Sequence, residues 1–283
     1  MTVLGGCNPV APAGGGGIPY PRGAVVVVRM ESIGGFALYE ALFTSIPGFT
    51  LLGDGRVIIV GVHDPSVPGP AAPDLRVRRL TEQGIQSVLL RLGESGQLDD
   101  SASWTGRQAT VVDAATTRFT VRAHDREVVV DVYALGMASE QGVTVDLPPD
   151  EQAAHEALTA VEADLLDLDS WVPADEWADP GWQIYEPPAI RLLIGNVDGE
   201  EPMPEAGEPM EWPGTIPPGQ LGQESPLEAL RCGVVAGAEA GTWYAALRQA
   251  TEVTRWFHDG HLYRVVPRPL LPDEELTCGT LEG

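Results

Sequence analysis

The sequence predicts an α+β fold, in which an antiparallel sheet carries two packed helices and is followed by a smaller α+β unit closed by a disulfide. Short β-branched runs joined by tight turns predict the strands, and two amphipathic patterns predict the helices. Cys232 and Cys278 bracket the last part of the chain. With 283 residues, of which 43% are hydrophobic, the chain is long enough for two modest cores.

The strands of the first domain, expected over residues 24–172, follow from local patterns. The run AVVVVRM that starts at Ala24 is β-branched and predicts a buried strand. In FTLLGDGRVIIV the turn at residues 53–55 separates two apolar runs, and an Asp-Gly pair favours a hairpin because the tight turn needs positive φ. A short strand is expected over residues 75–80. A second hairpin is expected where FTVRA and EVVVDVY flank residues 124–126.

Two helices complete this domain. Thr81 is expected to start the first, whose apolar residues recur at i, i+3, i+4 and i+7 and therefore share one face. Asp150 is expected to cap the second, which carries a single apolar stripe and ends near Trp171 and Pro173. The residues of the two faces are Ile85, Val88, Leu89 and Leu92 in the first helix, and Ala154, Leu158, Val161, Leu165 and Leu168 in the second.

The C-terminal unit is expected over residues 184–283 and includes a strand at 189–195. The residues SPLE at 225–228 combine a capping box with proline at the first helical position, which predicts a helix. A second short helix is expected around residues 239–250. The stretch VTRWFHDGHLYRVVPRPLLP predicts a hairpin that turns at residues 259–260.

The charge of the chain excludes several classes of function. The formal net charge is -24, from 41 acidic and 17 basic residues, and every basic residue is arginine. Without lysine the chain has no Walker A loop, no pyridoxal phosphate Schiff base and no kinase active site. Such acidity also argues against nucleic acid as a partner. A GC-rich genome that encodes arginine explains the missing lysine, and a salt-adapted surface is the alternative.

The acidity is concentrated between Asp146 and Trp212, where 18 acidic residues accompany one basic residue, Arg191. Residues 173–183 and 196–224 are therefore expected to form an acidic, proline-rich linker or loops. The tryptophans of this segment either pin it to a domain or form a binding groove. A possible partner contact is predicted at the tryptophans Trp177, Trp182 and Trp212.

The N-terminal residues 1–23 are expected to form a disordered tether. LGGC, which ends at Cys7, resembles the lipobox of bacterial lipoproteins, in which the cysteine is lipidated and becomes the mature N-terminus. The apolar run of a signal peptide does not precede it. Residues 8–23 contain four prolines and a run of glycines, as a flexible spacer would. Cys7 is the predicted lipid attachment site, and an incidental cysteine in a disordered terminus is the alternative.

The two remaining cysteines, Cys232 and Cys278, are predicted to pair, because an exported protein would oxidise them. Two buried thiols in a cytoplasmic protein are the alternative. The predicted location is extracytoplasmic, either at the outer face of the cell membrane through a lipid anchor or secreted. No stretch approaches the length of a transmembrane helix, so any attachment to the membrane would be by lipid.

No motif of catalysis or metal binding stands out, and neither a metal nor a cofactor is expected. His258 and His261 flank a turn, but their spacing matches no zinc motif. The chain contains no HExxH sequence, and GESGQ, which begins at Gly93, is not a nucleophile elbow. Carboxylate pairs are too abundant to single one out as an acid-base pair.

Several stretches carry a resemblance to a family. FTLLGDGRVIIVG, LRVRRLTEQGIQSVLLRL, FTVRAHDREVVVDVYALG, RCGVVAG and VPRPLLPDEELTC, with the LGGC start, resemble uncharacterised secreted lipoproteins of GC-rich bacteria. The first domain is also similar to a widespread domain of unknown function with a GDG hairpin. The resemblance implies location and fold and supplies no catalytic residues.

The leading hypothesis is a non-enzymatic extracytoplasmic lipoprotein that acts as a binding or interaction module of the cell envelope. Its partner would be an envelope protein or a polysaccharide. A secreted protease-inhibitor-like protein is the alternative, suggested by the disulfide-closed unit of helix and hairpin. A hydrolase that uses carboxylates of the acidic segment is the third hypothesis.

Overall fold

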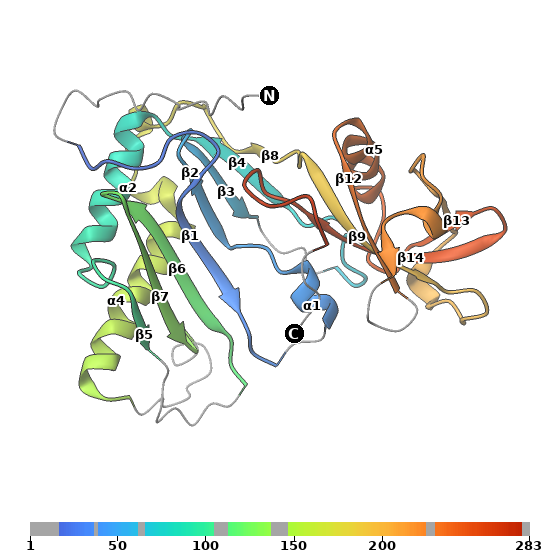
Figure 1. Cartoon of the computed structure of the whole chain (residues 1–283), viewed down its shortest axis with the longest axis horizontal. Coiled ribbons are helices and arrows are strands. Elements are labelled where there is room, and N and C mark those ends of the chain that lie inside the picture. Colours follow the sequence, from blue (N-terminus) through green and yellow to red (C-terminus); the bar gives the residue numbers. More distant parts are fainter. Residues whose placement is uncertain are drawn as a thin grey trace, which may run out of the picture.

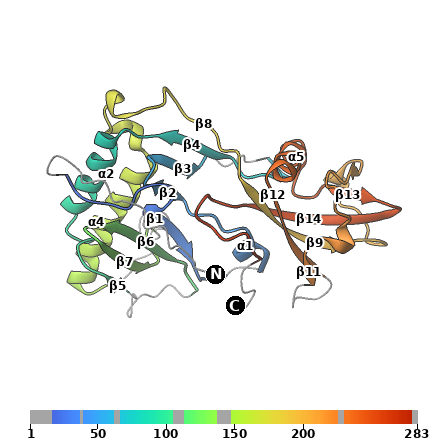
Figure 2. The same cartoon turned by 45° about the horizontal axis from the view of Figure 1, so that its top comes forward.

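Two β-sheets lie side by side along the long axis of the molecule (Figures 1 and 2). The computed structural model describes residues 17–36, 39–61, 66–104, 113–136, 147–224 and 230–278. The predicted α+β class is confirmed. The first sheet has eight strands in the order β5-β7-β6-β1-β2-β3-β4-β8, and the second has six in the order β10-β13-β14-β9-β12-β11.

The first sheet is built from the predicted hairpins, and neighbouring strands are antiparallel except for β5 and β7. The β2–β3 pair turns at the predicted GDG sequence. The β6–β7 pair turns at His124 and Asp125, two of the predicted residues 124–126, and Arg126 already belongs to β7. Its strands are β1 (Val26–Ile33), β2 (Phe49–Leu52), β3 (Arg56–Val60), β4 (Leu75–Arg79), β5 (Ala102–Trp104), β6 (Thr116–Ala123), β7 (Arg126–Tyr133) and β8 (Gln183–Ile184).

Helices α2 (Glu82–Glu94) and α4 (Pro149–Leu166) cover one face of this sheet (Figure 1). The predicted apolar faces are the buried ones, and they pack on alternate residues of the strands to form one core. Thr81 caps α2 as predicted, since its side chain accepts a hydrogen bond from the N–H of Gly84 at 3.2 Å. The predicted cap at Asp150 is wrong. The helix starts at Pro149, whose fixed φ suits the first position, and Asp150 lies inside the first turn.

The second sheet takes two short strands, Met210–Glu211 and Gln223–Glu224, from the predicted acidic segment 196–224, and its other strands come from either side of that segment. Helix α5 (Ala238–Leu247) packs on one of its faces, and the aromatic side chains of Trp243 and Trp256 are among its fully buried residues. The predicted hairpin turn is confirmed at Asp259 and Gly260, which both have positive φ. The strands are β9 (Ala189–Asn196), β10 (Met210–Glu211), β11 (Gln223–Glu224), β12 (Leu230–Ala236), β13 (Arg255–His258) and β14 (His261–Pro269).

A helix was predicted to start at the capping box, residues 225–228. The described residues that follow do not form it. Residues 225–229 lie outside the described residues, and the chain from Leu230 to Ala236 forms strand β12. Seven residue pairs join β12 to β9, and this long-range pairing decides the local structure. The strand predicted at 189–195 belongs to the second sheet, as expected.

The predicted tether is too long at its C-terminal end. The N–H of Ile18 donates to Gln86 of α2 at 2.7 Å, and Tyr20 is buried in the first core. Gly53 permits this packing, because a side chain at that position would collide with the carbonyl oxygen of Pro21. Residues 17–23 are therefore part of the folded domain, and residues 1–16 lie outside the described residues.

Residues 173–183 are not a linker. The N–H of Ala178 donates to the carbonyl of Arg79 at 2.9 Å, and β8 pairs with β4 just beyond. The N–H of Tyr185 donates to the carbonyl of Leu75 at 2.9 Å. The segment thus lies along the outer edge of β4, so the first domain extends past the predicted boundary at 172 and the second sheet begins at β9.

Residues 270–278, here called the C-terminal strap, tie the two sheets together (Figures 1 and 2). Leu271 is buried against Val26 and Leu52, on the face of the first sheet opposite the helices. Arg29 of β1 forms an ion pair with Asp273 at 2.7 Å. Helix α1 (Tyr39–Thr44), which the sequence did not predict, connects β1 to β2 and contacts β14 of the second sheet.

Candidate binding cleft

A cleft of about 940 Å³ lies where the two sheets meet. Its walls come from α1, the end of β3, the chain before β4, the loop after β9, the loop before β13, and β14. This volume lies within the range of sites that bind small molecules. The lining includes the side chains of Glu40, Val60, Asp74, Glu200, Glu201, Met203, Glu252, Val253, Arg255 and Arg264.

Arg255 shapes one wall of the cleft. Its Nη1 and Nη2 atoms donate to the backbone carbonyls of Glu200 and Glu201 at 2.9 and 3.0 Å. The guanidinium therefore fixes the backbone of this acidic loop. The hydrogen bonds engage the two carbonyls and leave both glutamate side chains exposed at the cleft.

Another part of the wall is a pairing between segments far apart in the sequence. The N–H of Ala71 donates to the carbonyl of Ala250, and the N–H of Glu252 donates to the carbonyl of Gly69, both at 3.0 Å. The Glu252 carboxylate also accepts a hydrogen bond from the N–H of Gly69 at 3.1 Å. The cleft is thus bounded by structure that forms only when both sheets are in place.

The carboxylates that line the cleft fall into two groups. Glu40 forms an ion pair with Arg264, and Asp74 forms one with Arg76 at 2.8 Å. Within the described part of the chain, the side chains of Glu200, Glu201 and Glu252 have no arginine or histidine partner within ion-pair distance. The cleft therefore carries uncompensated negative charge.

Strand β14 contributes carbonyl groups. The Leu262 carbonyl accepts a hydrogen bond from Val197 on the β9 side, so the alternation of a strand directs the carbonyls of Val265 and Pro267 away from β9. The pairing with β13 ends at Arg264. Pro267 has no N–H to offer. At Pro267 the edge of β14 therefore presents a carbonyl acceptor and no N–H donor.

The predicted contact tryptophans serve the fold instead. Trp177 is buried in the first core, with the guanidinium of Arg78 4.0 Å from its ring centroid. Trp182 is half-buried against it and donates from Nε1 to Asp169 at 2.7 Å. Trp212 is buried at 4.7 Å from the Trp243 ring. The prediction of an exposed aromatic contact is therefore wrong for Trp177 and Trp212, because both rings fill cores.

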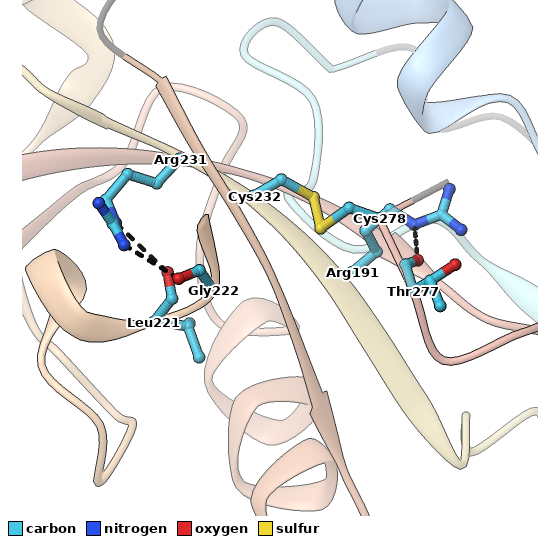
Figure 3. The surroundings of a disulfide bond; sticks show 7 residues. All are labelled: Arg191, Leu221, Gly222, Arg231, Cys232, Thr277 and Cys278. Atoms are coloured by element: carbon cyan, nitrogen blue, oxygen red, sulfur yellow. Dashed lines mark hydrogen bonds between the residues drawn. A yellow bond between two sulfur atoms is a disulfide. The ribbon is translucent and has the colours of Figure 1, made fainter. Parts of the chain in front are cut away.

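Cys232 and Cys278 form the predicted disulfide (Figure 3). Their Cα atoms are 6.0 Å apart, and the bond joins β12 to the end of the C-terminal strap. Arg191 of β9 holds the strap beside it, since its Nε donates to the Thr277 carbonyl at 2.9 Å (Figure 3). Cys7, the predicted lipidation site, lies outside the described residues.

The histidines of the β13–β14 hairpin have separate surroundings. His261 Nδ1 lies 2.5 Å from an oxygen of Asp198. The N–H of Leu262, with the side chains of His261 and Asn196, lowers the pKa of Asp198 to about 2. His258 lies near Trp212, with ring centroids 6.4 Å apart. Among the residues that the structure describes, no three histidine, cysteine or acidic side chains gather as a metal site.

Sequence reasoning missed the cleft. In the sequence, Glu200 and Glu201 are two of many acidic residues between Asp146 and Trp212. No motif distinguishes Glu252 from other glutamates. Pro267 was the one available indication, because proline in a β-branched run favours a strand edge.

The chain was compared with protein-family models, with curated proteins and with solved structures, and none of them matches it. None of the described helices is long and apolar enough to span a bilayer.

Proposed function

We propose that the protein is a non-enzymatic extracytoplasmic lipoprotein that binds a partner of the cell envelope in the cleft between its sheets. The observation that carries this proposal is the cleft itself, a volume of about 940 Å³ with exposed apolar and acidic side chains on its walls. Two apolar residues of its lining, Val60 and Met203, are 41% and 60% exposed. Apolar side chains left exposed inside a concave site favour binding.

The state of the carboxylates supports binding rather than acid-base catalysis. A catalytic acid or base needs a carboxylate that is free to meet the substrate. Glu40 and Asp74 are instead engaged by Arg264 and Arg76. In the proposed function these two ion pairs shape the wall of the cleft.

The disulfide supports the proposed location. Disulfides persist in oxidising compartments outside the cytoplasm, and this one holds the strap that joins the two sheets. The LGGC sequence adds the proposed anchor at Cys7. Incorporation of an alkyne-labelled fatty acid by cells that express the protein tests this part. We expect labelling that Cys7→Ser abolishes, and an unlabelled wild-type protein would contradict the anchor.

Filling the cleft tests the binding function. Val60→Trp places a bulky side chain in the cleft, and Val25→Trp is the matched control, because Val25 is 42% exposed and lies outside the cleft. Both proteins are immobilised and incubated with envelope extract, and bound components are identified and then tested as purified species. We expect a component that wild type and Val25→Trp retain and Val60→Trp loses. Equal retention by both variants would exclude the cleft as the site.

A further inference from the structure

We propose that the ligand of the cleft is a polypeptide segment that carries arginine or lysine side chains between apolar ones. This inference rests on the proposed function, which makes the cleft the binding site, and adds the chemistry of what enters it. Four features of the cleft lead to this class of ligand.

The first feature is the set of carboxylates. Glu200, Glu201 and Glu252 lack an ion-pair partner among the described residues, whereas Glu40 and Asp74 already have arginines. Carboxylates that face a cleft can accept short charge-assisted hydrogen bonds from guanidinium or ammonium groups. A ligand with basic side chains supplies these partners.

The second feature is that the basic side chains of the cleft are already engaged. Arg255 donates to the carbonyls of Glu200 and Glu201, and Arg264 pairs with Glu40. An anionic ligand would have to break these contacts before it could reach a guanidinium. It would also meet the three unpaired carboxylates, so like-charge repulsion disfavours it.

The third feature is the edge of β14. The carbonyls of Val265 and Pro267 point away from β9, and Pro267 offers no donor. Regular strand addition needs donors and acceptors in alternation, so a long added strand is disfavoured here. Single N–H groups of a peptide backbone or of a guanidinium can still donate to these carbonyls.

The fourth feature is the apolar lining. Val60, Met203 and Val253 lie in the same cleft as the glutamates. The aliphatic stems of arginine and lysine, and any apolar neighbours, can cover such side chains while the charged ends reach carboxylates. A polypeptide that combines basic and apolar side chains satisfies both parts of the wall.

A peptide-binding measurement tests the inference. The probe is a short fluorescein-labelled peptide of alternating arginine and valine, and fluorescence anisotropy gives its Kd. The cleft variant Glu200→Gln/Glu201→Gln/Glu252→Gln removes the unpaired carboxylates. The matched control Glu205→Gln/Glu208→Gln/Glu211→Gln removes the same charge from exposed glutamates of the acidic segment that do not line the cleft.

We expect the cleft variant to bind the arginine peptide about tenfold more weakly than wild type, and the control variant to bind it within about twofold. A peptide with glutamine in place of arginine should bind at least about tenfold more weakly to the wild type. Equal weakening by the two variants would mean that overall acidity attracts the peptide, and would overturn the inference. Unchanged binding to the cleft variant would overturn it as well. Thermal unfolding of both variants verifies that they fold.

The two proposals can fail separately. If Val60→Trp abolishes capture of an envelope component but the cleft variant retains it, the cleft binds a partner of different chemistry and only the inference is lost. If the captured component is a polysaccharide, the inference is likewise lost and the proposed function remains. Calcium ion is tested as a competitor at physiological ionic strength, and displacement of the arginine peptide by stoichiometric calcium would replace the peptide with a cation as the ligand.

Discussion

Arg268 and Glu274 form a buried ion pair in the bend where β14 enters the C-terminal strap. Nη2 lies 2.6 Å from Oε1, and the side chains are only 8% and 18% exposed. Glu274 also accepts a hydrogen bond from the N–H of Leu271 at 2.6 Å, and Arg268 donates to the Ser45 carbonyl at 2.9 Å. The pair thereby joins the strap to the chain that follows α1.

Replacing Glu274 should destabilise the protein at neutral pH. Burial acts to raise the pKa of Glu274, but the hydrogen bonds and charge of Arg268 outweigh it, so the pKa lies below its usual range. Glu274→Gln leaves the Arg268 charge buried without a counterion, and we expect a loss of about 3 kcal/mol in the free energy of unfolding at pH 7. Urea unfolding measures this loss.

The same variant gives a pH test. Because the pKa of Glu274 is lower in the folded than in the unfolded protein, its contribution is complete above the unfolded value of about 4.3 and is lost as pH falls through the folded value. The stability difference between wild type and Glu274→Gln should therefore shrink below about pH 4. A difference that stays constant to pH 2 would contradict the assignment.

Removing the disulfide should loosen the strap. The bonded cysteines are 46 residues apart in the sequence, and loop-entropy reasoning gives about 4 kcal/mol for a bridge of that span. We expect the free energy of unfolding of Cys232→Ser/Cys278→Ser, measured in urea, to be lower than that of wild type by about 4 kcal/mol. Wild type in reducing buffer should behave similarly. Cys7→Ser is the control, and its stability should equal that of wild type.

His155 should make the protein sensitive to mild acid. Burial lowers its pKa, with Glu151 acting in the opposite direction, and its Nε2 has no hydrogen-bond partner in the described part of the chain. The unfolded chain then takes up the proton first, so stability falls as pH drops below about 6.5. We expect His155→Phe to remove this dependence of stability on pH. The variant should also raise the free energy of unfolding by about 1 kcal/mol at pH 7.

The control for this substitution is His124→Asn, at an exposed turn position with positive φ that asparagine tolerates. It should retain the acid sensitivity of the wild type. Thermal unfolding between pH 5 and pH 8 measures both variants. If His155→Phe follows the wild-type pH dependence over this range, the histidine is not its source.

The tryptophans should differ in their effect on stability. Trp212 is buried against Trp243, and its Nε1 donates to the Ile216 carbonyl at 2.9 Å, so Trp212→Ala should cost about 4 kcal/mol. Trp182 is half-buried, and Trp182→Ala should cost about 1 to 2 kcal/mol. Similar small losses in both variants would restore the prediction that these rings serve a partner.

Local signals were enough for part of the fold. The hairpin at Asp259 and Gly260 was predictable because the tight turn depends on two residues with positive φ. The α2 face was predictable because one helix carries all its apolar positions at a regular spacing. Strand β12 was not, since its pairing with β9 outweighs the capping box that precedes it.

The cleft could not be predicted for the same physical reason. Its wall at Gly69 and Glu252 joins residues 183 positions apart, and no local pattern reports such a contact. Composition also misled at residues 173–183, because acidic and proline-rich sequence is typical of linkers. Trp177 and the hydrogen bond from Ala178 to Arg79 attach that segment to the first sheet.

Short strands at the outer edges of both sheets bear on how the protein behaves at high concentration. β5 has three residues, and β8, β10 and β11 have two each, so in the described part of the chain every sheet ends in a strand too short to template another molecule. Cross-β stacking needs a longer flat edge with little charge. Together with a net charge of -24, this arrangement should slow fibril nucleation even when the protein is crowded on a surface.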